Sequence, residues 1–442
     1  MQTSLSLLNK RRFLPLFITQ LLGAFNDNLF KNAMVFFIVF EVYNDAAAET
    51  LFTAVATAVF IIPFVLLSSF AGQLADMRDK ARIIRIVKFC EILIMIVGAG
   101  GLFMAWMGFE ITLLAVPLMM IALFAMGVHS TFFGPIKYAI LPQHLKPEEV
   151  LGGTGLVEAG TYIAILLGTI LAGIIAIEWA AAAVLVTALV GYISARQVPT
   201  APPQQVDMKL DYNIVRSTVR LVGDTMHIRT LFLAIISISF FWTIGAVLFI
   251  QFPPLVKNIL GADKEIASLF LAIFSIGIAV GSIAINRLLQ GAVSARFAPA
   301  CIIVMGLFVV AFHFVCANWV KAQDGSLYDF AAFLLHPGAA ALLATLFGIA
   351  VAGGMFVVPL YAFLTTTVPK DKTARTVAAN NIVNTFAMVA GSLIALGLSW
   401  AGVPIVNQLL LGAAMCLISA WLAAQLRRAE KLDRSEGHSS GE

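Results

Sequence analysis

Long apolar runs recur along the whole chain, and they constrain its fold more than any other feature. A helix needs about 20 residues to cross the roughly 30 Å hydrocarbon core of a bilayer. The sequence divides into twelve runs of about that length or longer, with 60% hydrophobic and 12% charged residues, against about 25% charged in a soluble domain. We therefore predict an all-α polytopic membrane protein with twelve transmembrane helices, and a soluble enzyme is excluded. The predicted ranges are 13–40, 49–74, 82–106, 111–140, 150–177, 179–196, 229–256, 266–286, 297–320, 332–366, 373–399 and 402–426.

Lysine and arginine residues gather in alternate loops of this arrangement. One side carries most of them, whereas the opposite side has only Lys257, Lys264 and Lys321. Because short loops rich in Lys and Arg stay in the cytoplasm, both termini are predicted to be cytoplasmic. The basic residues follow membrane topology, so no nucleic-acid partner is indicated.

A long polar stretch from Arg196 to Arg229 lies close to the middle of the chain. It begins VPTAPPQQ, which is typical of a linker, and we expect its basic residues to face membrane lipids. The predicted organisation is an N-terminal six-helix half (1–196), a cytoplasmic linker (197–228), a C-terminal six-helix half (229–426) and a cytoplasmic tail (427–442).

The two predicted halves also resemble each other. FGPIKYAILP (133–142) aligns with VVPLYAFLTT (357–366), and LGGTGLVEAG (151–160) with VAANNIVNTF (377–386). Such repeats are typical of transporters whose site lies at the interface between two halves. The alignment makes three counterpart pairs, which are Pro135 and Pro359, Lys137 and Tyr361, and Glu158 and Asn384.

Polar residues interrupt the first apolar run at GAFNDNLFK (23–31). A charge near the middle of a bilayer costs at least about 2.5–3.5 kcal/mol, so such a group is a functional-site candidate. Asp27 lies about 21 Å along the predicted helix, and Lys31 follows at i+4, where the two can pair. The pair either neutralises itself or forms a site where a charged substrate group or a coupling cation competes for Asp27. We expect Asn26 or Asn28 to bond a neighbouring helix.

Other charged groups lie inside later runs. Glu158 lies in a glycine-dense stretch that permits close helix approach, so we expect its carboxylate to face protein or a cavity and to act in binding or gating. Lys137 either reaches water along its long side chain or contacts substrate. Lys88 and Glu91 are three residues apart and are expected to pair. Two lone histidines, His129 and His313, are expected to be satisfied core groups.

The second half contributes neutral polar groups to its runs. Asn380 and Asn384 share one face of the predicted helix 373–399, and Tyr361 lies on the preceding helix. Amides donate and accept hydrogen bonds without titrating, so these groups suit orientation of a glycerol or phosphate group.

No sequence motif indicates catalysis, a cofactor or a metal. The sequence has no GxGxxG, P-loop or HExxH motif in a usable context, and its four cysteines lie in apolar runs without ligand-like spacing, where they are expected to act as small hydrophobes. They are Cys90, Cys301, Cys316 and Cys416.

The segment GQLADMRDKAR (72–82) resembles the signature loop of the major facilitator superfamily. That resemblance implies that Gly72 permits close helix packing and that Asp76 forms a cytoplasmic charge latch with the basic residues of the loop. Asp79 stands near the position where the family has a glycine. The basic residues that match the family pattern in type are Arg78, Lys80 and Arg82.

A closer resemblance covers nearly the whole chain. The strings QLLGAFNDN, FFGPIKYAIL, GLVEAGTYIAILLG, GGMFVVPLYA and NNIVN are similar to those of the lysophospholipid transporter family, a branch of the same superfamily. The resemblance implies transport of lysophospholipid to the cytoplasmic leaflet of the bacterial inner membrane, with membrane lipids and a cytoplasmic acyltransferase as further partners. We expect a monomer, without cofactors.

The chain departs from that family on the seventh helix. Family members carry a basic residue there, a few positions after an SLFW-like string, but SFFWTIGAVLF (239–249) has no cation before Lys257. Lys31 and Lys137 are therefore the intramembrane candidates to balance a phosphate.

Two other functions remain open from the sequence. One is a proton-coupled exporter of a small amphipathic compound, with Asp27 or Glu158 as the carboxylate that takes up the proton. The other is a membrane scaffold that docks an acyltransferase through its linker and tail.

Overall fold

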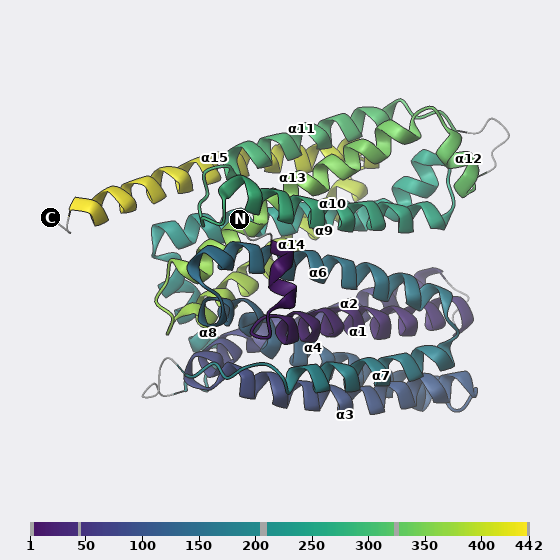
Figure 1. Cartoon of the computed structure of the whole chain (residues 1–442). Coiled ribbons are helices and arrows are strands. Elements are labelled where there is room, and N and C mark those ends of the chain that lie inside the picture. Colours follow the sequence, from purple (N-terminus) through teal and green to yellow (C-terminus); the bar gives the residue numbers. More distant parts are fainter. Residues whose placement is uncertain (1–3, 43–45, 204–209, 322–326, 440–442) are drawn as a thin grey trace. The chain divides into compact units, whose positions relative to one another are not determined.

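The computed structural model describes residues 4–42, 46–203, 210–321 and 327–439, and these residues are almost entirely helical (Figure 1). Short 3-10 or π-helical turns lie at Ser4–Asn9, Ile38–Val42, Ile111–Ala115 and Val256–Leu260. The α-helices are α1 (Leu14–Phe37), α2 (Ala46–Met77), α3 (Lys80–Trp106), α4 (Val116–Ala139), α5 (Leu141–His144), α6 (Pro147–Ile174), α7 (Ile177–Ala195), α8 (Ile214–Met226), α9 (Arg229–Leu255), α10 (Lys264–Leu289), α11 (Ala298–Ala317), α12 (Phe330–Leu335), α13 (Ala339–Thr366), α14 (Thr373–Trp400) and α15 (Ile405–Ser439).

The predicted twelve-helix membrane fold is confirmed. Among the described residues, eleven helices are long and apolar enough to cross a membrane. α1 is not one of these eleven because of its polar residues, but its 24 residues extend about 36 Å. With α1, the chain has the twelve expected long helices.

Two of the predicted ranges differ from the observed helices. The run 332–366 is not one helix, because the chain breaks at His336, Pro337 and Gly338 between α12 and α13. His336 adopts an extended backbone, as a residue before proline tends to do. The last span was predicted to end at 426, but α15 continues through the charged segment to Ser439, since Ala, Glu, Lys and Arg there favour helix.

The chain divides into two compact units, which are Met1–Gly223 with Thr365–Ile382, and Asp224–Leu364 with Val383–Glu442. In unit 1, α1 packs against α6 and α7, α3 packs against α4 and α7, and α2 packs against α4. Glycine permits some of these contacts. A Cβ on Gly168 of α6 would lie 2.5 Å from the Phe25 carbonyl oxygen of α1, so only glycine fits there.

The same pairwise packing recurs within unit 2. α15 packs against α9 and α11, as α7 packs against α1 and α3 in unit 1. α10 approaches α13 closely, and a Cβ on Gly277 would lie 2.5 Å from the Ala350 Cβ. This pair corresponds to α2 with α4. The recurrence agrees with the internal repeat predicted from the sequence.

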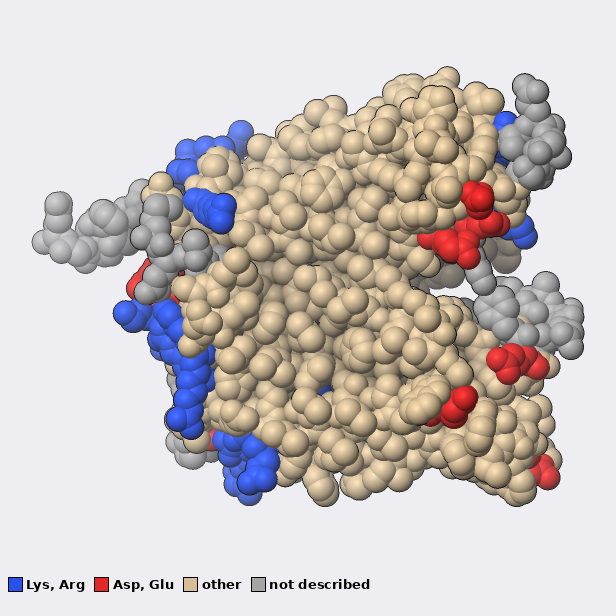
Figure 2. Space-filling model, turned by 45° about the vertical axis from the view of Figure 1, so that its right-hand side comes forward, with Lys and Arg blue, Asp and Glu red and all other residues tan. Residues whose placement is uncertain are grey.

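Positively and negatively charged side chains lie in different regions of the surface. On the face drawn in Figure 2, Lys and Arg side chains lie mostly at one end of the helices and Asp and Glu mostly at the other. This segregation agrees with the alternation of basic loops. The cytoplasmic placement of both termini stays a prediction.

The start of the predicted linker packs on the loop between α2 and α3. Asp79 caps α3 and accepts a hydrogen bond at 3.1 Å from the Ala201 N–H, while the Lys80 N–H donates to the Ala201 carbonyl at 3.1 Å. Arg85 donates to the Val198 carbonyl at 3.1 Å. Asp79, which lies near the glycine position of the signature loop that this segment resembles, therefore anchors the linker.

Candidate functional site

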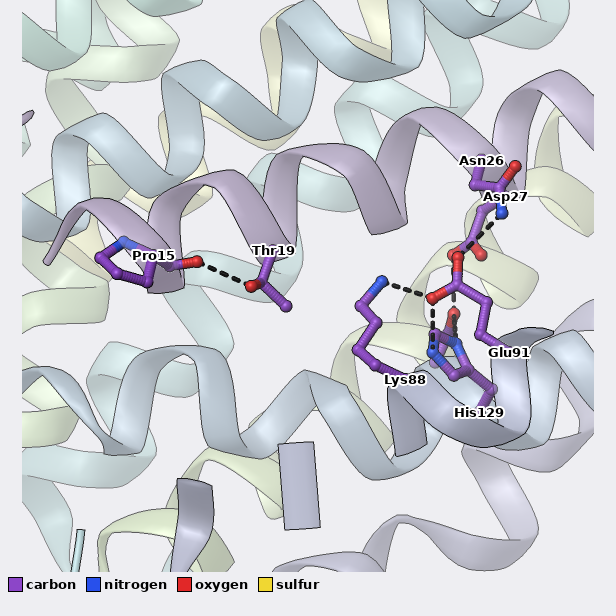
Figure 3. A network of polar contacts seen from close by, with 8 residues as sticks. Pro15, Thr19, Asn26, Asp27, Lys88, Glu91 and His129 are labelled. Carbon is purple, nitrogen blue, oxygen red and sulfur yellow. Dashed lines mark hydrogen bonds and ion pairs between the residues drawn. The ribbon is translucent and has the colours of Figure 1, made fainter. Parts of the chain in front are cut away.

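A buried carboxylate, Glu91, is the centre of a polar cluster that joins α1, α3 and α4 (Figure 3). Its Oε2 lies 2.5 Å from Lys88 Nζ and 3.2 Å from His129 Nε2. Its Oε1 accepts a hydrogen bond from Asn26 Nδ2 at 2.8 Å. The Lys88 and Glu91 side chains are 0% and 1% exposed, so this is an ion pair without access to solvent. The predicted pairing of Lys88 with Glu91 is confirmed, as is the bond from Asn26 to a neighbouring helix.

The local sequence of α1 makes room for this cluster. A Cβ on Gly23 would lie 2.7 Å from Lys88 Nζ, so glycine leaves the space that the ammonium occupies. Asn26 follows one turn later on the same face and reaches Glu91. In the GAFN segment, Gly23 thus leaves room for the Lys88 ammonium, and Asn26 donates a hydrogen bond to Glu91, the partner of Lys88.

Asp27 is held by a neutral group. Ser130 Oγ donates to Asp27 Oδ2 at 2.6 Å, and the same Oγ lies 3.4 Å from His129 Nδ1. Asp27 Oδ1 is buried without a hydrogen-bond partner among the described residues.

The predicted pairing of Asp27 with Lys31 is not formed. No ion pair within 4 Å joins these two described residues, and Lys31 Nζ lies 5.9 Å from the centre of the Phe60 ring on α2. The i+4 spacing places both groups on one face of α1, but Asp27 instead accepts a hydrogen bond from Ser130 on α4.

Glu158 on α6 is the second carboxylate of unit 1 that retains an unbonded oxygen. Tyr138 OH donates to Glu158 Oε1, and Oε2 is buried without a partner in the described part of the chain. Lys137 Nζ lies 4.8 Å from the Tyr138 ring centre. Lys137 interacts electrostatically with Glu158 and Asp27, although no described acidic group lies within ion-pair distance of it.

The predicted polar residues Tyr361 and Asn384 form a neutral cluster in unit 2. Ser239 Oγ donates to Asn384 Oδ1 at 2.7 Å, and Trp242 Nε1 donates to Tyr361 OH at 2.7 Å. Asn384 Nδ2 lies 3.5 Å from the same hydroxyl. Asn380, which falls in the part of α14 assigned to unit 1, is fully buried, and both its side-chain polar atoms lack partners among the described residues.

Asp76 binds the start of α14 within unit 1. Its carboxylate accepts hydrogen bonds from the Ala374 N–H at 3.1 Å, the Arg375 N–H at 3.2 Å and Arg375 Nε at 3.1 Å. A Cβ on Gly72 would lie 2.7 Å from the Ala378 Cβ. The loop predicted as a latch therefore joins α2 to the N-terminus of α14, where the helix dipole also favours a carboxylate.

The basic residues of this loop differ in environment. Arg78 and Arg82 are exposed, whereas Lys80 is fully buried and its Nζ has no hydrogen-bond partner among the described residues. The cation that contacts Asp76 is Arg375, which the sequence interpretation did not include.

The sequence interpretation also missed His129, Ser130, Ser239 and Trp242 as site residues. His129 was assigned to the core, and nothing in the sequence relates it to Asp27, which is 102 positions earlier on another helix. Ser239 and Trp242 lie within the SFFW string noted for its missing cation. Within the described residues, no group of three or more His, Cys, Asp or Glu side chains is placed to hold a metal ion.

Comparisons with known proteins agree with this architecture. A family model described as Major Facilitator Superfamily matches residues 16–392. A protein named lysophospholipid transporter LplT from Serratia proteamaculans (strain 568) is 27% identical over 383 residues, covering 84% of this chain and 83% of that protein. The protein of the same name from Salmonella gallinarum (strain 287/91 / NCTC 13346) is 26% identical over 382 residues, with coverage of 84% and 82%.

Two solved structures have the same fold. The human organic anion transporter MFSD10 matches with a TM-score of 0.70 at 12% identity, covering 93% of this chain and 99% of that one. A bacterial homologue of the iron transporter ferroportin, in an outward-facing state, matches with a TM-score of 0.68 at 13% identity, covering 94% and 99%.

Proposed function

The chain belongs to the Major Facilitator Superfamily, and we propose that this membrane transporter flips lysophospholipids, such as lysophosphatidylethanolamine, across the bacterial inner membrane to the cytoplasmic leaflet. The relatives named lysophospholipid transporters, similar over 84% of the chain, support this cargo. The transporter acts as a monomer by alternating access, with both termini in the cytoplasm.

The observation that carries the proposal is a set of incompletely bonded charges of both signs in unit 1. Lys31 and Lys137 are ammonium groups that form no ion pair with any described residue. Asp27 and Glu158 each keep one buried oxygen without a hydrogen-bond partner among the described residues. A zwitterionic head group offers a phosphate to the first pair and an ammonium to the second. Buried charges need such partners because an unpaired one is costly.

The roles follow from this chemistry. Lys137 and Lys31 bind the phosphate, which compensates for the absence of a seventh-helix cation. Asp27 and Glu158 bind the ammonium or a coupling ion. Asn26 acts through Glu91, to which it is bonded. The neutral groups that orient the glycerol region are Tyr361, Asn380 and Asn384.

Asp76 supplies the conformational latch in this proposal. Its three hydrogen bonds to Ala374 and Arg375 and the close contact at Gly72 stabilise one state of the alternating-access cycle. The same segment also carries the exposed Arg78 and Arg82 and the buried Lys80.

Uptake of labelled lysophosphatidylethanolamine into proteoliposomes tests the proposal. The double variant Asp27→Asn, Glu158→Gln keeps side-chain size and removes both charges, and it should lower the uptake rate at least about tenfold, since a hydrogen bond to a charged group contributes about 1.5–3 kcal/mol. His313→Gln is the matched control, because His313 contacts the Val406 carbonyl in unit 2. Wild-type uptake by the double variant would remove the site assignment.

The alternative is a proton-coupled exporter of a small amphipathic compound, which the unbonded Glu158 Oε2 supports. That transporter requires a pH gradient and no acyl chain. Glycerophosphoethanolamine, which lacks the chain, separates the two functions, because only the exporter accepts it as well as the lysophospholipid.

We also propose a cytoplasmic acyltransferase partner that restores the second acyl chain. Replacing the exposed basic residues of α8 and α15 tests whether the chain docks that enzyme. Intact transport with lost lipid remodelling supports docking through these segments, and unchanged remodelling contradicts it.

A further inference from the structure

A cavity of about 470 Å³ lies at one end of unit 2, between the turn that follows α9 and the first turn of α10. Side chains of both charges line it, because Lys257 lies in that turn and Asp263 and Glu265 lie at the start of α10. The rest of the described lining is apolar and includes Val256 and Leu327. Ligand pockets have volumes of roughly 300–1,000 Å³, so this cavity is large enough to hold a small polar group.

Hydrogen bonds from the connection between α11 and α12 fix the walls of this cavity. The Asp263 N–H donates to the Tyr328 carbonyl at 3.1 Å, and the Tyr328 N–H donates to the Gly261 carbonyl at 2.7 Å. Trp319 Nε1 donates to the Leu260 carbonyl at 2.9 Å. The cavity is therefore formed before a ligand binds, as most small-molecule sites are.

The charged side chains of the cavity are available to a ligand. Among the described side chains, Lys257, Asp263 and Glu265 form no ion pair within 4 Å. Asp263 is the N-cap residue of α10, yet its side chain makes no capping hydrogen bond, although aspartate at this position usually accepts one from the first turn. The Ile266 N–H donates instead to the Asp263 main-chain carbonyl. The carboxylate is thus not used by the helix that it precedes.

The charges around the cavity favour a zwitterion over an ion of one sign. The segment 256–267 contains Lys257 and Lys264 as well as Asp263 and Glu265, so its formal charge is zero and it does not attract anions or cations as a class. Its separated charges suit a ligand that carries a phosphate and an ammonium, each of which forms charge-assisted hydrogen bonds with the opposite sign. Lys321 lies beside the same turn, near Gly261, but outside the described lining.

The cavity lies at the depth expected for lipid head groups. The apolar spans on either side of it end at Phe252 and begin at Glu265, so Lys257 falls just outside the hydrophobic region. Trp319 and Tyr328, which hydrogen-bond to this turn, are residue types that gather at membrane–water interfaces.

Apolar side chains extend from the cavity onto α12. Leu327 is 47% exposed and lines the cavity. α12, which packs against α10, exposes Phe330, Leu334 and Leu335, the last of them by 85%. Exposed apolar side chains at the edge of a bilayer contact acyl chains, so the polar cavity and this surface together fit an amphipathic molecule.

We propose that this cavity binds the phosphoethanolamine head group of a lipid, with the phosphate at Lys257 and the ammonium at Asp263 and Glu265. The inference rests on the proposed function for its cargo: lysophosphatidylethanolamine binds here first, and its head group then moves to the charged groups of unit 1 within the membrane. The cavity lies on the side opposite the basic loops, which is the side where that cargo starts. Phosphatidylethanolamine of the bilayer carries the same head group and is the second source of this ligand.

Initial uptake rates test the cavity in proteoliposomes of phosphatidylcholine and phosphatidylglycerol. Lys257→Gln should raise the KM for both lysophosphatidylethanolamine and lysophosphatidylglycerol about two- to fivefold, which corresponds to loss of an exposed ion pair. The double variant Asp263→Asn, Glu265→Gln should raise only the KM for lysophosphatidylethanolamine, because lysophosphatidylglycerol has no ammonium. Maximal rates should not change, since the charged groups of unit 1 are intact.

Two control variants and a change of bilayer complete this experiment. Lys321→Gln and Glu110→Gln alter exposed charges outside the described lining and should leave the KM unchanged. Adding phosphatidylethanolamine to the vesicles should raise the KM for lysophosphatidylethanolamine in the wild type but not in Lys257→Gln if the bilayer lipid also binds. An unchanged wild-type KM, with the variant effects present, shows that only the lysolipid binds. Wild-type KM values in both cavity variants would overturn the proposal.

Photolabelling tests the same cavity without transport. Lysophosphatidylethanolamine with a diazirine on the acyl carbons nearest the glycerol should label residues 256–267 in the wild type and in Lys321→Gln, and at least about twofold less in Lys257→Gln. Mass spectrometry of the full chain in nanodiscs locates the label. No label in this segment would overturn the proposal and leave the proposed function standing. Label there, with no uptake of either lysolipid, would support the cavity and count against the proposed function.

Discussion

Removing the carboxylate of Glu91 is expected to destabilise unit 1 strongly. Glu91 contacts Lys88, His129 and Asn26, and in Glu91→Leu the fully buried Lys88 ammonium would keep no anion beside it. Breaking a buried pair from one side costs roughly 3–5 kcal/mol. At about 2–4 °C per kcal/mol for a domain of 150–250 residues, the melting temperature should fall by roughly 6–20 °C.

A double-mutant cycle isolates the pair. Lys88→Met with Glu91→Leu removes both charges and keeps the volume apolar, so the double variant should be more stable than Glu91→Leu alone, with an interaction energy of about 2 kcal/mol or more. The assay is thermal unfolding of the detergent-purified protein. Arg216→Gln, which breaks an exposed pair with Asp211, is the control and should leave the melting temperature unchanged. A double variant as unstable as the sum of its single variants would refute the coupling of Lys88 to Glu91.

Three further predictions concern the latch, the neutral cluster and the linker. Gly72→Val should slow transport at least about tenfold, because a Cβ there would lie 2.7 Å from an α14 methyl; an unchanged uptake rate contradicts this. Tyr361→Phe removes the hydroxyl that accepts from Trp242 Nε1 and lies beside Asn384, and it should weaken lysolipid binding by roughly 5- to 100-fold and lower the melting temperature by a few degrees; equal Kd values argue against the site. Burial lowers the pKa of His144, which lies beside the Thr200 carbonyl, so the stability that its buried neutral ring contributes here is complete above about pH 6.5 and is lost as pH falls through the lowered pKa. Hydrogen-exchange protection at 198–201, taken relative to the intrinsic exchange rate at each pH, should therefore be lower at pH 5 than at pH 7.5, and His144→Gln should remove the difference.

The sequence predicted the helices well because the bilayer requirement acts on each segment separately. A run of about 20 apolar residues identifies a spanning helix without reference to its neighbours. It does not locate a break inside a run, so the turn at His336, Pro337 and Gly338 was missed although it contains both a proline and a glycine.

Pairing of charges was predicted less well, and two pairs on neighbouring helices show why. Lys88 and Glu91 lie three residues apart and form an ion pair, while Asp27 and Lys31 lie four apart and do not. Helical spacing shows which groups share a face, but whether two of them form an ion pair also depends on the side chains of the neighbouring helix. Ser130 donates a hydrogen bond to Asp27, and no local pattern in the sequence relates residues 103 positions apart.

The internal repeat gives a physical reason to expect charge selection in unit 1. Tyr361 occupies the position that corresponds to Lys137, and its hydroxyl lies beside Asn384, the counterpart of Glu158. In unit 1 the corresponding hydrogen bond, to Glu158, comes from the hydroxyl of Tyr138, the residue after Lys137. In unit 2, therefore, the residue that corresponds to Lys137 is the tyrosine that makes the hydroxyl contact, and no cation stands at that position. In the proposed function, head-group charge within the membrane is therefore assigned to unit 1, while the Tyr361 hydroxyl and the Asn384 amide of unit 2 are expected to bond polar groups of any charge.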